Sequence, residues 1–143
     1  MEKALVDVIL AQHAEADAFM ATPGNWMGKL PSPEDTEYWS QRVPSGTLAE
    51  YNRITLEEDA YYTCAEATSK SYARSHDYSS MTDEQLESMC ETYSAWIRAD
   101  IEAEETRIAE EEQRMDTIAS DLGVDRDTLN RWMEQEEANY ETA

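Results

Sequence analysis

The chain has 143 residues, of which 41% are hydrophobic, and its 32 acidic and 11 basic side chains give a formal net charge of −21. This length fits one compact domain, and the hydrophobic content is sufficient for a buried core, which excludes a fully disordered chain. No stretch approaches the roughly 18 apolar residues of a membrane span, so the sequence indicates a soluble, cytoplasmic protein with no membrane partner.

The negative charge is uneven along the chain. Residues 82–143 carry 19 acidic and five basic side chains, a net charge of −14, whereas residues 1–81 have a net charge of −7. A surface of this sign repels nucleic-acid phosphates and favours cationic partners.

Apolar positions that recur every three or four residues predict a first helix over residues 5–20. The irregular segment 22–47 follows and holds all four prolines and three of the four glycines. Its tryptophans, Trp26 and Trp39, are candidate anchors for a protein partner, because exposed tryptophan is typical of interface hot spots. The alternative interpretation is that these side chains pack the segment against the hydrophobic core.

Capping boxes mark helix starts in the middle of the chain. Thr47 and Glu50 form one such box, in which the threonine oxygen accepts from an early backbone N–H and the glutamate reaches back. Residues 55–58 repeat the pattern. The stretch from there to about Arg74 is therefore either part of one irregular helix or the second of two helices in series.

A third capping box, at Thr82 and Gln85, predicts the longest helix, over residues 82–121, because no helix breaker follows before Gly123. The fold class predicted for the whole chain is all-α, a small helical bundle in a single domain over residues 1–143.

The apolar seam of the long helix thins after Ile101 to single residues seven apart, Ile108 and Met115. This narrow spacing is typical of a helix packed against one partner or supercoiled with a copy of itself. A homodimer through the long helix is thus one predicted arrangement.

The long helix also carries an acidic run, residues 100–116, with eight acids and two arginines. We expect four of the acids to stack along the face opposite the seam: Glu102, Glu105, Glu112 and Asp116. Neighbours three or four residues apart on a helix lie about 5–6 Å from each other, which is of the order of the phosphate spacing in a nucleic acid. The face is a candidate surrogate for a row of phosphates. The alternative interpretation is an ordinary solvated face.

The C-terminal segment, residues 117–137, has the pattern of a helix-turn-helix. Small or apolar residues occupy the first helix, Gly123 occupies the turn, and Asp125 is a natural N-cap for the second helix. Four apolar residues are predicted to lock the second helix across the first: Leu122, Val124, Leu129 and Trp132.

Residues 117–133 resemble the helix-turn-helix superfamily at every position of this pattern. The resemblance implies that Arg126, Asn130 and Arg131 face the major groove of DNA. The acidic flanks oppose this role, as does the lack of any lysine beyond Lys70, because phosphate contacts supply most of the affinity for DNA.

No catalytic or metal-binding motif accompanies these features. The sequence lacks a glycine-rich phosphate loop, an HExxH pair, a nucleophile elbow and an EF-hand loop, and its cysteines, Cys64 and Cys90, lack paired spacing. We therefore expect a protein that is not an enzyme and that takes no cofactor and no metal.

In size, acidity and helical content the chain resembles phage-encoded inhibitors of host defence, namely DNA-mimic anti-restriction proteins and many anti-CRISPR proteins. The resemblance implies a stoichiometric inhibitor whose partner is a basic nucleic-acid-binding protein or complex. A helix-turn-helix transcriptional regulator is the alternative function. A third interpretation is that the acidity reflects adaptation to high salt, which screens charge.

Overall fold

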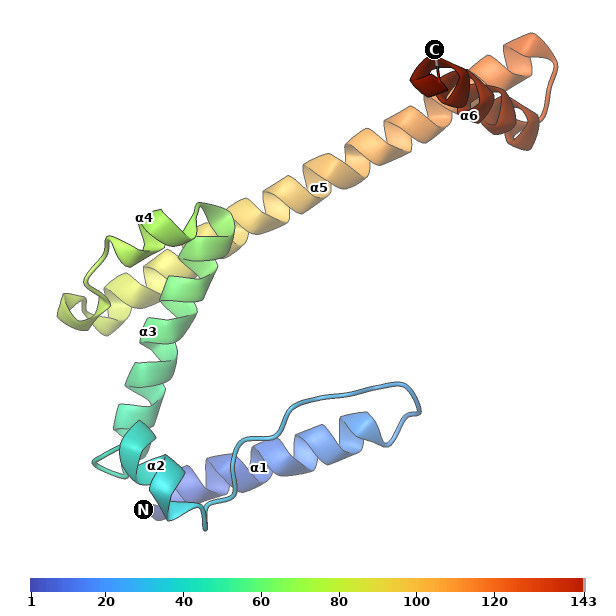
Figure 1. Ribbon diagram of the computed structural model, residues 1–143. Helices are drawn as coiled ribbons and strands as arrows, with labels where there is room; N and C mark the ends of the chain where they lie inside the picture. The colour runs from blue at the N-terminus through green and yellow to red at the C-terminus, as the bar shows by residue number, and fades with distance from the viewer. Residues whose placement is uncertain (143) are drawn as a thin grey trace. The chain divides into compact units, whose positions relative to one another are not determined.

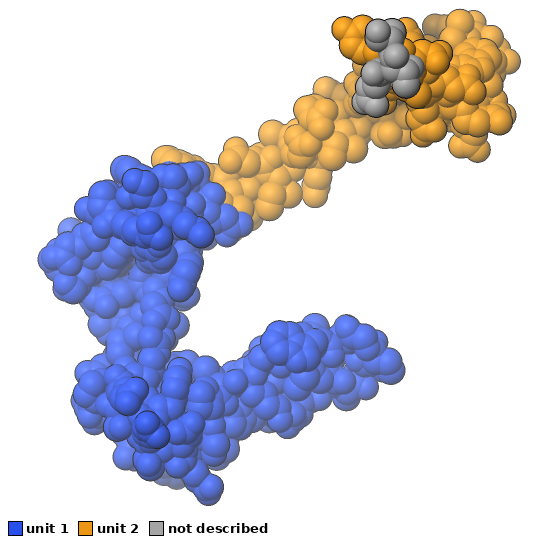
Figure 2. Space-filling view, viewed as in Figure 1, with its two compact units in different colours: residues 1–94 blue, residues 95–143 orange. Residues whose placement is uncertain are grey.

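The computed structural model describes the backbone of residues 1–142 and the side chains of residues 1–140. Six α-helices and one short 3-10 helix form this part of the chain, which contains no strand, so the predicted all-α class is confirmed (Figure 1). None of the helices described is long and apolar enough to cross a bilayer. The chain divides into two compact units, residues 1–94 and residues 95–143 (Figure 2). The single domain expected from length stays a prediction.

The first hydrophobic cluster joins α1 (Lys3–Met20), α2 (Thr36–Arg42) and the N-terminal half of α3 (Leu48–Ala67). Leu5 and Ile9 pack here against Trp39, which is only 3% exposed. The indole N–H of Trp39 donates to the carbonyl of Ser32 at 2.9 Å, which satisfies the polar edge of the ring. Trp39 is therefore a core residue, whereas Trp26 is 80% exposed and is the accessible one of the two predicted anchors.

Polar contacts hold the irregular segment before α2 alongside α1 (Figure 1). The side chain of Gln12 donates to the Gly28 carbonyl at 2.8 Å and accepts from the Leu30 N–H at 2.9 Å. His13 hydrogen-bonds the Leu30 carbonyl through Nε2 at 2.6 Å. Three backbone groups of a proline- and glycine-rich stretch are thus satisfied by neighbouring side chains of one helix.

Helix α3 begins at Leu48 as the first capping box predicts, but the box is only half formed. Thr47 Oγ1 accepts from the Glu50 N–H at 3.2 Å, whereas the Glu50 side chain accepts from the Ser45 N–H at 3.0 Å rather than from Thr47. The chain then forms two helices in series, because α4 (Lys70–Arg74) follows a break at residues 68–69.

The third capping box is fully formed at the start of α5 (Asp83–Leu122). Thr82 Oγ1 accepts from the Gln85 N–H at 3.2 Å, and the Gln85 side chain accepts from the Thr82 N–H at 2.9 Å. Arg53 of α3 anchors the same end of the helix. It forms an ion pair with Asp83 at 2.5 Å and donates to the Tyr78 carbonyl of the 3-10 helix (Tyr78–Ser80) at 3.1 Å.

Replacement of the two tryptophans in turn should separate their roles. Trp39→Ala should lower the free energy of unfolding by about 3–5 kcal/mol, because it empties a buried site. Trp26→Ala is the matched control and should change it by no more than about 0.5 kcal/mol. Urea unfolding followed by circular dichroism measures both. Similar losses in the two variants would contradict the burial of Trp39.

Candidate functional site

The unit formed by residues 95–143 is a helical hairpin, in which the C-terminal part of α5 packs against α6 (Arg126–Thr142). Met115, Ala119 and Leu129 are its buried residues, with Ile118 and Val124 packed against them. The hairpin thus has the helix, turn and helix predicted from residues 117–137. Two of the four predicted lock residues do not serve as expected, because Leu122 and Trp132 are 58% and 48% exposed, and Met115 fills the contact instead.

The turn of the hairpin depends on Gly123, whose φ is +70°. This left-handed conformation is easily adopted only by glycine. It lets the Val124 N–H donate back to the Ala119 carbonyl at 3.0 Å, which ends α5. Asp125 then caps α6: its carboxylate accepts from the Thr128 N–H at 2.7 Å, and this hydrogen bond holds the Asp125 pKa below its usual value.

Arg126 lies at the centre of the polar contacts between the two helices. Its guanidinium forms ion pairs with Asp116 at 2.9 Å and with Glu112 at 3.0 Å, and it donates to the Asn130 amide oxygen at 3.1 Å. The hydrogen bonds to Asp116 and Glu112 raise the Arg126 pKa above its usual value. Two of the predicted phosphate surrogates are therefore bound to one of the predicted DNA-reading residues, Arg126, which also contacts a second, Asn130.

The predicted acidic face lies beside the apolar seam rather than opposite it. At about 100° of rotation per residue, Glu105 and Glu112 project within about 40° of Ile101, and Asp116 within about 60°. The contacts of Arg126 agree, since α6 packs over Met115 of the seam and reaches Glu112 and Asp116 from there. Of the four acids, Glu102 and Glu105 stay unpaired with any basic side chain in the part of the chain that the structure describes.

Internal ion pairs use most of the arginines in residues 95–143. Arg107 pairs with Glu104 at 2.7 Å and Arg114 with Glu111 at 2.8 Å, each within one turn of α5. The hydrogen bond from Arg107 holds the Glu104 pKa below its usual value. Arg131, the third predicted DNA-reading residue, donates to the Thr128 hydroxyl at 3.3 Å.

The remaining carboxylates of residues 95–140, apart from Asp125, which caps α6, form what we call the acidic surface. Each is exposed, and none has a basic side chain within ion-pair distance among the residues described. Its members are Asp100, Glu102, Glu105, Glu110, Asp121, Asp127, Glu134, Glu136 and Glu137. Sequence reasoning did not single out Glu134, Glu136 or Glu137 of α6, although the count of acids over bases in residues 82–143 already indicated them.

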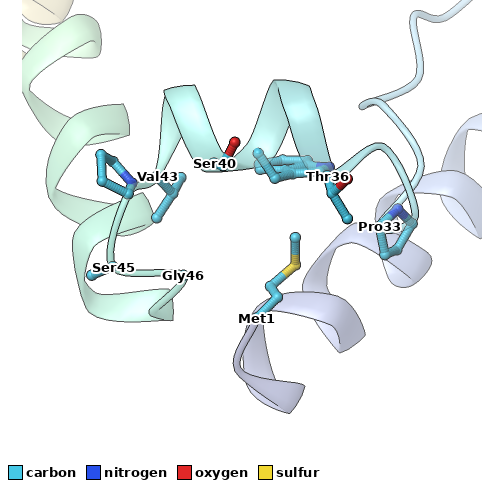
Figure 3. Close-up of a pocket in the computed structure, with 9 residues that line it drawn as sticks. Met1, Pro33, Thr36, Ser40, Val43, Ser45 and Gly46 are labelled. Atoms are coloured by element: carbon cyan, nitrogen blue, oxygen red, sulfur yellow. The ribbon is translucent and has the colours of Figure 1, made fainter.

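A hollow of about 340 Å³ in the other unit offers less chemistry (Figure 3). It lies between α2 and the N-terminus, and the side chain of Met1 points into it toward α2. Proline, serine, threonine and apolar residues line it, with no carboxylate, imidazole or thiol among them. No three metal-ligating side chains converge anywhere among the residues described.

No protein-family model, curated protein or solved structure matches the chain. Among the residues described, the acidic surface is the largest group of exposed charges of one sign.

Arg126→Gln should loosen α6, because it removes the cation that binds α6 to Glu112 and Asp116 of α5. We expect faster amide hydrogen exchange in residues 126–137. Arg131→Gln removes the same charge from the same helix but only a contact with Thr128, so it should leave exchange nearly unchanged. Equal protection of α6 in both variants would show that the apolar contacts alone close the hairpin.

Proposed function

We propose that the protein is an acidic inhibitor that binds and blocks a basic nucleic-acid-binding surface of another protein by mimicking nucleic-acid charge, as in phage-encoded anti-CRISPR or anti-restriction proteins. One observation carries the proposal. In residues 95–140, three of the five arginines form ion pairs with acids of the same unit, while the nine carboxylates of the acidic surface have no basic side chain within ion-pair distance among the residues described.

The uncompensated carboxylates suit this function because a lysine- and arginine-lined surface evolved to hold phosphates. A concentrated negative field speeds the encounter with such a surface, and each carboxylate accepts hydrogen bonds from a guanidinium much as a phosphate oxygen does. Glu102 and Glu110 are suited to direct contact, because they project about 100° and 180° away from Ile101 and its apolar seam. Trp26 offers an exposed aromatic anchor of its own.

The regulator alternative has less support from the contacts. A recognition helix must present its cations and amides to DNA. Arg126 and Asn130 are hydrogen-bonded to each other, and Arg126 also to two carboxylates, so DNA binding would require these bonds to be exchanged. The third predicted DNA-reading residue, Arg131, has a single hydroxyl, that of Thr128, as its hydrogen-bond partner.

Reversing the charge of two acidic residues should show whether the acidic surface is the surface that inhibits the partner. The assay measures how the protein competes with fluorescent DNA for a panel of restriction endonucleases and CRISPR effector complexes. Against a panel member that the unmodified protein inhibits, Glu102→Lys with Glu110→Lys should weaken competition by about tenfold or more, which corresponds to about 1.4 kcal/mol.

The matched control is Asp7→Lys with Glu15→Lys, which changes the net charge equally on exposed positions of α1. We expect this pair to weaken competition much less and to leave the salt dependence of association nearly unchanged. Equal losses in the two pairs would show that total charge, rather than the acidic surface, governs binding. Failure to compete against every panel member would count against this class of partner.

Direct binding to DNA provides the opposing test. At about 150 mM salt the protein should give no gel shift on mixed-sequence duplex DNA, because its net charge opposes phosphate contacts. A tight shift that disappears in the Arg126→Ala, Arg131→Ala variant would overturn the proposal in favour of the helix-turn-helix regulator.

A further inference from the structure

The middle of α5 carries an apolar stripe that faces solvent. Every residue from 95 to 114 is exposed except Ile97, which is half-buried. Ile101 and Ile108 are 52% and 48% exposed. Ile97, Ile101 and Ile108 follow one another at spacings of four and seven residues, which places them on one side of the helix in the positions of a coiled-coil seam.

The one charged side chain within this seam is already compensated. Glu104 occupies the seam position between Ile101 and Ile108, and its carboxylate accepts two hydrogen bonds from Arg107, at 3.0 and 2.7 Å. The charge is thereby drawn to the edge of the stripe, and the methylene groups of Glu104 remain to cover a neighbouring isoleucine.

We propose that a second copy of this chain covers the stripe, with the two α5 helices antiparallel. In the register we assign, Ile97 lies opposite Ile108 of the second copy, and Ile101 lies opposite Glu104 of the second copy. This register places every isoleucine of the exposed stretch against the exposed stretch of the other helix. It ends before Met115, which α6 already covers.

Charges on the two edges of the stripe select this register. In an antiparallel pair, residues in equivalent edge positions face each other. Asp100 then faces Arg107 of the second copy, and Arg98 faces Glu105 of the second copy; each pair occurs twice by symmetry. A parallel pair would bring Asp100 against Glu105 and Glu104 against its own equivalent, which are like-charge contacts.

The same edges distinguish a second copy from a basic partner. They alternate in sign, with Arg98 and Arg107 beside Asp100 and Glu105, and this pattern complements its own reversed copy rather than a uniformly basic surface. The dimer goes beyond the proposed function. It leaves Glu102 and Glu110 outside the contact and is tested on the purified chain alone, so either idea can fail without the other.

Disulfide trapping tests the register. Chains carrying Ile97→Cys and chains carrying Ile108→Cys, both in a Cys90→Ser background, are mixed and oxidised, with one chain extended by a tag. We expect a crosslinked dimer of one long and one short chain, and little crosslinking of either variant with itself. Self-crosslinking of each variant would show a parallel pair, and no crosslinking in the mixture would overturn the register.

Sedimentation equilibrium at about 150 mM salt tests the edge charges, since the Debye length there is about 8 Å and limits the repulsion between two acidic chains. Arg98→Glu should raise the dimer Kd by about tenfold, and adding Glu105→Arg should restore most of the affinity. Arg131→Glu, an equal charge change on α6, should leave the Kd unchanged. A monomer at all accessible concentrations, or a loss that the second substitution does not repair, would overturn the proposal.

Discussion

Arg126 binds two carboxylates of α5 from the first turn of α6, and this contact typifies a constraint on the whole chain, which has 11 basic side chains for 32 acids. Three of its arginines, Arg42, Arg53 and Arg126, lie where segments meet. Arg42 of α2 pairs with Glu58 of α3, and Arg53 of α3 reaches the start of α5. With so few cations, those that join helices internally cannot also neutralise the surface. The contacts that close the fold therefore leave the remaining carboxylates uncompensated.

As a consequence, the carboxylates of α5 fall into two sets with different roles in stability and recognition. Carboxylates paired within the helix, such as Glu104 and Glu111, stabilise it by contacts between neighbouring turns. Carboxylates on the far side of the helix, such as Glu102 and Glu110, have no ion-pair partner among the residues described. Ile97, Ile101 and Ile108 form a stripe on another side of the same helix. Helix α5 therefore presents both an apolar stripe and an acidic face. These two surfaces have different chemistry and suit different partners.

Local signals in the sequence predicted helix starts well and packing less well. Thr82 and Gln85 mark the start of α5 because a capping box is satisfied by residues adjacent in the chain. The similar pattern at residues 55–58 lies inside α3, where it starts nothing, because the helix already continues through it. The α5–α6 contact uses Met115 in place of Leu122 and Trp132. The angle at which two helices cross decides which apolar residues meet, and periodicity alone does not contain that angle.

The positions of the site residues could likewise be predicted only in part from the sequence. The position of Glu105 and Glu112 beside the seam follows from counting 100° per residue, so it was available from sequence. The capture of Glu112 by Arg126 was not, because it depends on how the turn at Gly123 returns α6 along α5. Burial likewise separated Trp39 from Trp26, which share the same irregular segment and cannot be distinguished by composition.

The basic side chains of residues 95–143 are all arginines, and this has a chemical consequence. This unit contains no lysine, histidine or cysteine, so besides one tyrosine its ionisable side chains are carboxylates and guanidinium groups. Carboxylic acids ordinarily ionise well below neutral pH and guanidinium groups well above it, so the unit lacks the side chains that ordinarily change charge near neutral pH. Lysine acetylation cannot alter the charge of this unit, because it contains no lysine. Ionic strength is then the main variable through which the surroundings modulate the field of this unit.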